Sequence, residues 1–490
     1  MVGTPFQRPT AGHRTAASAP GRQDGAAAGP PRVGPAVAAA FTVSWALAAV
    51  FDKAWYGHWA GSPANFCLAA ACCWMLATPR SARALLVLAA SQIADWFSDQ
   101  SILGNHPAIM AAVNATLLVA AVQRGVVRAW RDDDASDVLT TAAPGIRLEV
   151  LAIYFWAAFH KLNTDFLSID HGCVTFIATE PRHRPWPMIF LPVGPGWLRA
   201  GMHGTLIVES LIPAFLFSKR TRGAGVLLAV WFHSFLSSGP RNGFFAFAVV
   251  IFPLVWLFAG EEAMTRLAAL ARRVGGRLEV SAAAAARCAA LVAVVVATVA
   301  AARLQVNRTF PAWIACDALV LAWSAAEVWR GMTGTGECRP GVFRCGPPAL
   351  FVMPLLVLFN GACPYLGLKT ETSFAMYSNL RTEGGRTNHM LIPAGVAPFR
   401  FQDDLVEVID SSDPSLRSIA RSGMLLPWFD LRRRAWMNPS MGVSFVRDGR
   451  TVVVTTVGDR PDLVPPVSWW AGRLMPFRPV EREGPRRCDH

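Results

Sequence analysis

The chain has 490 residues, of which 53% are hydrophobic and only 16% are charged. A soluble protein of this size would carry about a quarter charged residues, so the composition indicates a polytopic membrane protein. The net charge of +13 is spread over short loops between apolar segments and forms no basic, aromatic-rich face, which excludes nucleic acid as an expected partner.

Residues 1–34 are rich in Ala, Gly, Pro and Arg without periodicity, so we expect a disordered N-terminal tail there. A secretory signal is the alternative, but no clear cleavage site follows the first apolar run. We expect a mainly α, polytopic membrane helix bundle of about 9–11 spans over residues 35–361. The apolar segments that predict these spans lie at about residues 35–57, 63–78, 81–98, 106–124, 146–163, 198–218, 223–238, 242–260, 282–303, 310–330 and 347–361.

The charged residues predict how these spans are oriented. With the N-terminus inside, the inner side holds roughly 20 Lys and Arg residues, including Arg147, and the outer loops hold about 7. Cytoplasmic loops of membrane proteins carry this excess of positive charge. We therefore expect a multi-pass protein of the cell membrane with a cytoplasmic N-terminus.

The pattern changes after residue 361. Residues 405–409 alternate between apolar and polar, and residues 443–455 predict two strands around an Asp-Gly hairpin turn. We expect a small β-containing extracytoplasmic domain over residues 362–490. The cysteines lack the spacing of metal ligands, so we expect no metal. Three of them could face an oxidising compartment, but the sequence pairs none of them: Cys67, Cys173 and Cys363.

Lys161 lies in an apolar segment of membrane length, and the chain has only four lysines against 42 arginines. Arginine stays protonated, whereas a desolvated lysine can release its proton and act as a base. The alternative is a lysine that reaches toward the membrane interface from a helix end. Asp165 is four residues away and would favour the ammonium, whereas burial would favour the neutral amine, and the sequence leaves this open.

Three polar clusters fall at outer ends of predicted spans, so we expect them to surround one outward-facing cavity. Lys161, His106 and His233 are the expected catalytic residues, although a structural role is the alternative for each histidine. The supporting residues that we expect around them are Asp99, Asn105, His160, Asn163, Asp165 and Asn242.

Carboxylates also occur within the apolar segments. They would serve either as proton relays or as hydrogen-bond partners between helices, and we favour the second role. These residues are Asp95, Glu149, Glu209 and Glu327.

Four segments together resemble the vitamin K-dependent gamma-carboxylase family, especially its bacterial members. Residues 154–166 resemble the family segment in which a basic pair follows aromatic residues and precedes Leu and Asp. Residues 99–106 are similar to its motif ending in Asn-Asn-His, and His233 with residues 244–253 resembles its histidine-containing span. Residues 374–389 resemble the opening of its outer domain.

The resemblance implies a membrane enzyme with a horizontally transferred transmembrane domain. It would oxidise reduced vitamin K or menaquinol with O2 to an epoxide, and so generate a base for adding CO2 to glutamate in a peptide or protein. Lys161 would then deprotonate the quinol, with assistance from His106. The outer-domain motif residues implied by the resemblance are Ser378, Asn379, Arg381, Asn388 and His389.

The chain departs from the family pattern at Gln100 and His160, which stand where the family has lysines. A quinol epoxidase that does not carboxylate is therefore one alternative. A non-catalytic membrane partner in peptide maturation or export is another, and a bis-histidine haem protein is a third.

Overall fold

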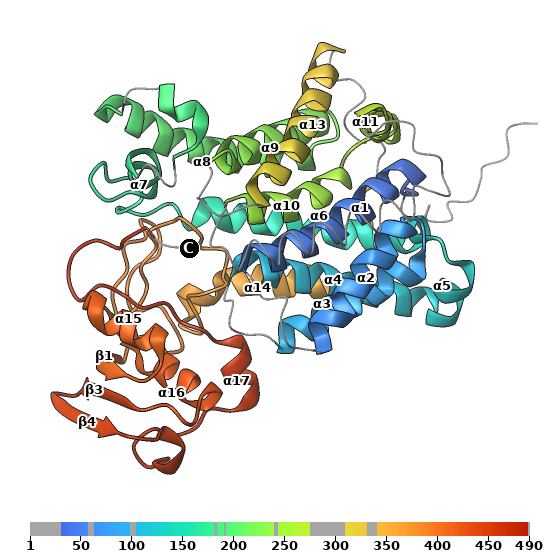
Figure 1. Cartoon of the computed structure of the whole chain (residues 1–490). Helices are drawn as coiled ribbons and strands as arrows, with labels where there is room; N and C mark the ends of the chain where they lie inside the picture. Colours follow the sequence, from blue (N-terminus) through green and yellow to red (C-terminus); the bar gives the residue numbers. More distant parts are fainter. Residues whose placement is uncertain are drawn as a thin grey trace, which may run out of the picture.

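The computed structural model describes residues 31–56, 63–98, 104–180, 184–190, 193–239, 244–274, 309–330 and 341–488. Within these ranges the chain is mainly helical, with a small antiparallel sheet in a C-terminal unit at one end of the helices (Figure 1). The helical elements are α1 (Pro35–Tyr56), α2 (Pro63–Ala77), α3 (Ala82–Ser98), α4 (Asn105–Arg124), α5 (Val126–Asp132), α6 (Ala135–Phe159), α7 (Cys173–Thr179), η1 (Trp186–Phe190), α8 (Pro195–Phe217), α9 (Arg222–Ser237), α10 (Phe244–Trp256), α11 (Glu261–Val274), α13 (Thr309–Trp329), η2 (Pro348–Phe351) and α14 (Val352–Leu366). The C-terminal unit contains β1 (Leu405–Ser411), α15 (Pro414–Ser422), β2 (Leu425–Pro427), α16 (Trp428–Met437), β3 (Val443–Arg447), β4 (Arg450–Val454), η3 (Val457–Asp459) and α17 (Trp469–Leu474).

Helices α1 to α6, α8 to α11, α13 and α14 contribute to one hydrophobic core, and α7 packs with the start of α8 in a smaller one. Helix α6 packs against α4, α8 and α14, and α1 packs against α10, so distant parts of the sequence lie side by side (Figure 1). Six helices of the described residues are long and apolar enough to cross a membrane, and two more apolar helices, α2 and α10, are shorter. The six are residues 35–54, 105–124, 135–159, 195–217, 312–329 and 348–366.

Most predicted apolar segments begin and end within a few residues of a helix, but α6 is a clear exception. It begins at Ala135 rather than residue 146, because the Asp134 side chain caps it by accepting a hydrogen bond from Ser136 N at 2.9 Å. Arg147, which we expected in an inner loop, is therefore buried in α6. Its guanidinium donates to Leu257 O at 2.9 Å. The predicted span 282–303 lies outside the described residues.

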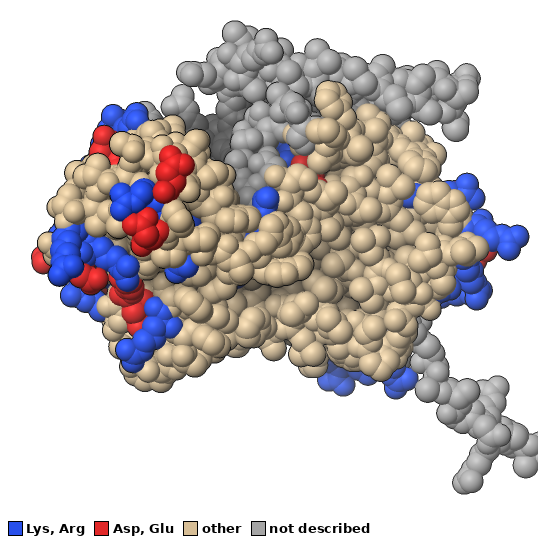
Figure 2. Space-filling model, turned by 90° about the horizontal axis from the view of Figure 1, so that it is seen from below, with Lys and Arg blue, Asp and Glu red and all other residues tan. Residues whose placement is uncertain are grey.

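The charged residues are unevenly distributed over the surface. On the face shown in Figure 2, both signs of charge gather over the C-terminal unit, and further Lys and Arg residues lie at the opposite edge. The exposed residues Arg128 and Arg131 belong to α5, which lies at that far end in Figure 1. A broad surface with few charges separates the two ends on this face, an arrangement compatible with a multi-pass membrane protein.

The sheet has the order β2-β1-β3-β4, and all neighbouring strands are antiparallel. The predicted Asp-Gly hairpin is confirmed between β3 and β4. Asp448 and Gly449 have φ angles of 50° and 72°, as a two-residue turn with both residues in the left-handed region requires. Helix α15 packs on β1, and the unit has a hydrophobic core of its own.

Candidate functional site

A cavity of about 580 Å³ lies at the end of the helix bundle that faces the C-terminal unit. Its wall is formed by the start of α4, the end of α6, helices α7 to α10, and residues 376–377. The lining is mostly apolar and aromatic. The three predicted catalytic residues, His106, Lys161 and His233, all line this cavity, together with the polar residues Asn105, Arg184, Thr205 and Glu209.

Lys161 lies two residues after the end of α6, and its buried Nζ atom is held by two groups. It donates to Ala157 O at 3.1 Å and lies 2.9 Å from Oε2 of Glu209, which comes from the middle of α8. Both side chains are at least nine-tenths buried. The carboxylate beside Lys161 is therefore Glu209 and not Asp165, so the amine is paired with a carboxylate and is not isolated in the cavity wall.

His106, at the start of α4, faces a carboxylate from α1. Its Nε2 atom lies 2.8 Å from Oδ1 of Asp52, and both side chains are buried. The next residue of α1, Lys53, forms a second buried ion pair with Asp95 of α3 at 2.7 Å. An aspartate at this distance can hold the imidazole ring in one orientation.

His233, in α9, is paired with a phenol from α6. Nε2 of His233 lies 2.7 Å from the hydroxyl oxygen of Tyr154, and the rings of Phe232 and Phe247 pack around the imidazole. A neutral imidazole can accept the phenolic proton or donate to its oxygen, so this pair can hold a proton next to the cavity.

The segment after α14 forms a strained wall of the cavity. Thr372, Phe374, Tyr377 and Asn379 all have positive φ angles between 51° and 65°, which are unfavourable for residues other than glycine. Asn105 holds this loop, because its Oδ1 atom accepts a hydrogen bond from Phe374 N at 2.6 Å. Backbone strain of this kind is common where a site must be held in one geometry.

Two residues that we expected to support catalysis instead stabilise the end of α6. His160 lies between Tyr365, whose hydroxyl is 2.8 Å from Nδ1, and Ser373 O, which is 3.0 Å from Nε2. Asn163 donates to His160 O at 2.8 Å and to Ser378 O at 2.6 Å. Neither residue lines the cavity.

Asp165 and the outer-domain motif connect the chain segments outside the bundle. Asp165 accepts hydrogen bonds from Asn388 Nδ2 at 2.9 Å and from Arg486 N at 2.8 Å. Asn379 accepts from Cys173 N at 2.8 Å, and His389 Nε2 lies 3.0 Å from Phe159 O. These side chains position the loops around the cavity without lining it.

The remaining expected residues also differ in their placement. Arg381 bonds through its backbone N to Asn388 Oδ1 at 2.9 Å, and the Ser378 hydroxyl donates to Ala375 O at 2.7 Å. Both are therefore structural. Asp99 and Asn242 lie outside the described residues.

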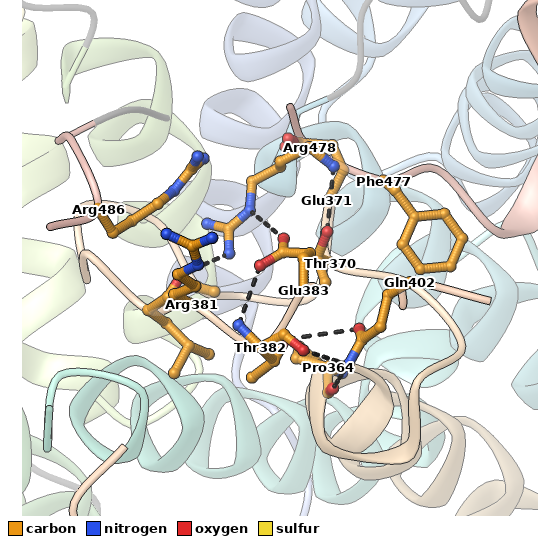
Figure 3. A network of polar contacts seen from close by, with 12 residues as sticks. Pro364, Thr370, Glu371, Arg381, Thr382, Glu383, Gln402, Phe477, Arg478 and Arg486 are labelled. Atoms are coloured by element: carbon orange, nitrogen blue, oxygen red, sulfur yellow. Dashed lines mark hydrogen bonds and ion pairs between the residues drawn. The ribbon is translucent and has the colours of Figure 1, made fainter. Parts of the chain in front are cut away.

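A buried charge network joins the segment after α14 to the segment after α17 (Figure 3). Glu383 is fully buried, and its Oε1 atom lies 3.8 Å from Nε of Arg478, while Thr382 N donates to its Oε2 atom at 2.9 Å. Arg478 also donates to Leu380 O at 2.9 Å. We name Glu383 and Arg478 the joint pair, because they hold the two segments together.

A disulfide also closes this region. Cys173, which lines the cavity at the start of α7, is bonded to Cys488. The sequence marked Cys173, Cys67 and Cys363 as candidates, but the latter two are free thiols. Cys488 was missed, because its sequence neighbours give no indication that it folds back over 315 residues.

Sequence reasoning missed two polar partners of the site and assigned a third residue to the wrong role. Asp52 and Tyr154 stood in apolar segments, and only a predicted contact between helices would have paired them with histidines. Glu209 was noted but assigned to structure. The chain matches no protein-family model, no curated protein and no solved structure, so its function is inferred from the cavity and the motif resemblance.

Proposed function

We propose that this chain is an integral membrane enzyme that oxidises a reduced naphthoquinone with oxygen and couples this reaction to carboxylation of glutamate in a peptide or protein. The observation that carries the proposal is the buried Lys161–Glu209 pair in the wall of an apolar cavity. Reduced vitamin K or menaquinol is the co-substrate, with O2 and CO2. Epoxidation without carboxylation is the narrower form of the proposal.

The cavity suits a quinol in size and chemistry. Its volume of about 580 Å³ falls in the range of small-molecule sites, and its wall offers an apolar surface to an apolar ring. The polar groups that reach it include an amine with its carboxylate and two imidazoles. Groups of this kind can exchange protons with the hydroxyls of a quinol.

The ion pair supports a proton relay instead of a free base. As the quinol hydroxyl gives its proton to Nζ of Lys161, Nζ passes one of its own protons to Oε2 of Glu209. Glu209 becomes a neutral acid, and Lys161 remains an ammonium beside the negative oxygen of the substrate. The number of protons and the total charge are unchanged. Oxygenation of the quinol then supplies the strong base that removes the glutamate γ-proton before CO2 adds.

The test is to give the purified protein several reduced naphthoquinones and O2, and to follow formation of the epoxide. A glutamate-containing peptide and labelled bicarbonate separate carboxylation from epoxidation alone. If the wild-type protein and Lys161 variants are equally inert with every quinol, the enzyme proposal is wrong. A protein that binds peptide but oxidises no quinol would instead be a non-catalytic maturation partner.

Replacing Asp52 tests the proposed role of His106. Asp52→Asn keeps the shape of the side chain but removes the charge that orients His106, so we expect quinol oxidation to fall about tenfold, less than the 10²–10⁴ typical of a lost acid–base group. His106→Ala should lower the rate further than it lowers expression. Asp132→Asn, at an exposed site in α5, is the control and should leave the rate unchanged. Equal losses of rate and expression in both His106 and Asp52 variants would mean that the pair is only structural.

We further propose that the N-terminus is cytoplasmic and that the cavity and the C-terminal unit are extracytoplasmic. The disulfide supports this orientation, because disulfides form and persist in oxidising compartments. In intact cells, an impermeant maleimide should label Cys173 and Cys488 only after reduction. Cys173→Ser should make Cys488 reactive without reduction. Labelling that requires permeable cells would contradict the orientation.

A further inference from the structure

A second apolar groove, of about 690 Å³, lies on the opposite side of the start of α4. One wall is a face of small residues on α4, made of Ala108, Ala111, Ala112 and Ala115. The other walls come from the end of α3, from α14 and from α17. Among the described residues, Gly104 is the one that lines both this groove and the cavity of the proposed enzyme.

Two cations, Lys369 and Arg473, line the groove. Lys369 donates to the Thr372 hydroxyl at 3.0 Å, and the Arg473 guanidinium lies 5.6 Å from the ring centre of Trp436. Within the described part of the chain, neither cation forms an ion pair, and Nε of Arg473 is buried without a hydrogen-bond acceptor. The described lining residues include no Asp or Glu.

The backbone brings these two cations to the same end of the groove. Thr370 N and Glu371 N donate to Pro476 O at 3.3 and 3.2 Å, which pairs the segment after α14 with the segment after α17. Burial lowers the pKa of Lys369 to about 8, and Cys363 and Glu371 offset only part of this effect. An anion bound at this end would favour the charged form of the lysine.

The apolar part of the groove continues into a surface suited to lipid chains. Leu356 and Phe359 of α14 line the groove and are half exposed, and Trp470 of α17 is 62% exposed. Tryptophan beside such a surface is typical of the level of lipid head groups. A ligand that fits both parts has an anionic head and a long hydrocarbon chain.

We propose that this groove binds one anionic phospholipid of the outer leaflet, with its phosphate between Lys369 and Arg473 and an acyl chain along the alanine face of α4. The site requires the proposed membrane orientation but not the quinol chemistry. Each basic residue near a head group strengthens binding of anionic lipid, so loss of both should weaken it about thirtyfold.

The experiment is native mass spectrometry of the full chain in detergent with phosphatidylglycerol, phosphatidylcholine or glycerol 3-phosphate. We expect one phosphatidylglycerol to be retained, and Lys369→Gln with Arg473→Gln to release it. Arg447→Gln is the matched control, because Arg447 also lies over a tryptophan ring, at 4.5 Å from Trp428, but is paired with Asp404 and lies outside the groove. Lys369→Gln alone removes one charge without disturbing the contact between Arg473 and Trp436. If the double variant misfolds, this single variant tests whether the charge is needed to retain the lipid.

A second pair of variants tests the place of the acyl chain. Ala112→Phe should fill the groove and lower retention, whereas Ala214→Phe, on the exposed side of α8, should not. Equal retention of phosphatidylcholine, no effect of the charge variants, or displacement by glycerol 3-phosphate at equal concentration would each overturn the inference. A dimer that Ala112→Phe dissociates would show that a second copy of the chain fills the groove instead. Quinol oxidation measured in the same variants separates failure of this site from failure of the proposed enzyme.

Discussion

Lys161→Arg is expected to abolish quinol oxidation while leaving the protein folded and inserted in the membrane. Arginine can keep the ion pair with Glu209, which lies 2.9 Å from Lys161, but it does not release a proton to the carboxylate. The loss should therefore be about 10²–10⁴-fold, the usual contribution of an acid–base group. The rate of epoxide formation from reduced menaquinone, measured at saturating oxygen, gives the result.

Two variants make this result specific to the relay. Lys219→Arg changes an exposed lysine just beyond the C-terminal end of α8 and should leave the rate unchanged. Glu209→Gln keeps a hydrogen-bond acceptor for Lys161 but removes the proton acceptor, so it should also lower the rate strongly. If Lys161→Arg retains activity, Lys161 serves only as a positive charge. If Glu209→Gln alone retains activity, Lys161 acts as a base without the relay.

Glu383→Ala is expected to cause the largest loss of stability. It leaves Arg478, which is only 3% exposed, as a buried charge without the carboxylate of the joint pair. Removing one partner of a buried ion pair typically costs about 3–5 kcal/mol. The thermal unfolding midpoint of the detergent-purified protein should fall accordingly, and the contacts between the C-terminal unit and the bundle should become accessible to protease.

A compensating variant distinguishes the joint pair from general disruption of packing. Glu383→Ala with Arg478→Met removes both charges, so it should recover part of the stability lost by Glu383→Ala alone. Glu407→Ala, which removes a half-exposed partner of Arg482, should change stability by about 1 kcal/mol or less. Equal midpoints for the wild type and Glu383→Ala would mean that the pair stabilises nothing.

The long apolar segments and the hairpin could be predicted because their signals are local. Span lengths of about 20 residues and the Asp448-Gly449 turn need no knowledge of distant contacts. The beginning of α6 was missed because a polar first turn capped by Asp134 carries no hydrophobic signal. Helices α15 to α17 were missed for a similar reason, since they are short and gain their stability from packing on the sheet and on one another.

The site was predictable only in part. Lys161, His106 and His233 were selected by depth and sidedness, and they do line a common cavity. The partner of Lys161 could not be predicted, because the sequence offers both Asp165, four residues away, and Glu209 on another helix. Asp165 lies past the end of α6 and turns to Asn388, which leaves Glu209 of α8 as the partner of the amine.

The disulfide between Cys173 and Cys488 has a consequence for the timing of biosynthesis. At ribosomal speeds of 5–20 residues per second, roughly 15–60 s separate synthesis of the two cysteines, which are 315 residues apart. During this interval Cys173, at the start of α7, has no Cys488 with which to pair. A chain released from the ribosome before residue 488 cannot form this disulfide. The bond is therefore present only in chains whose translation has reached Cys488.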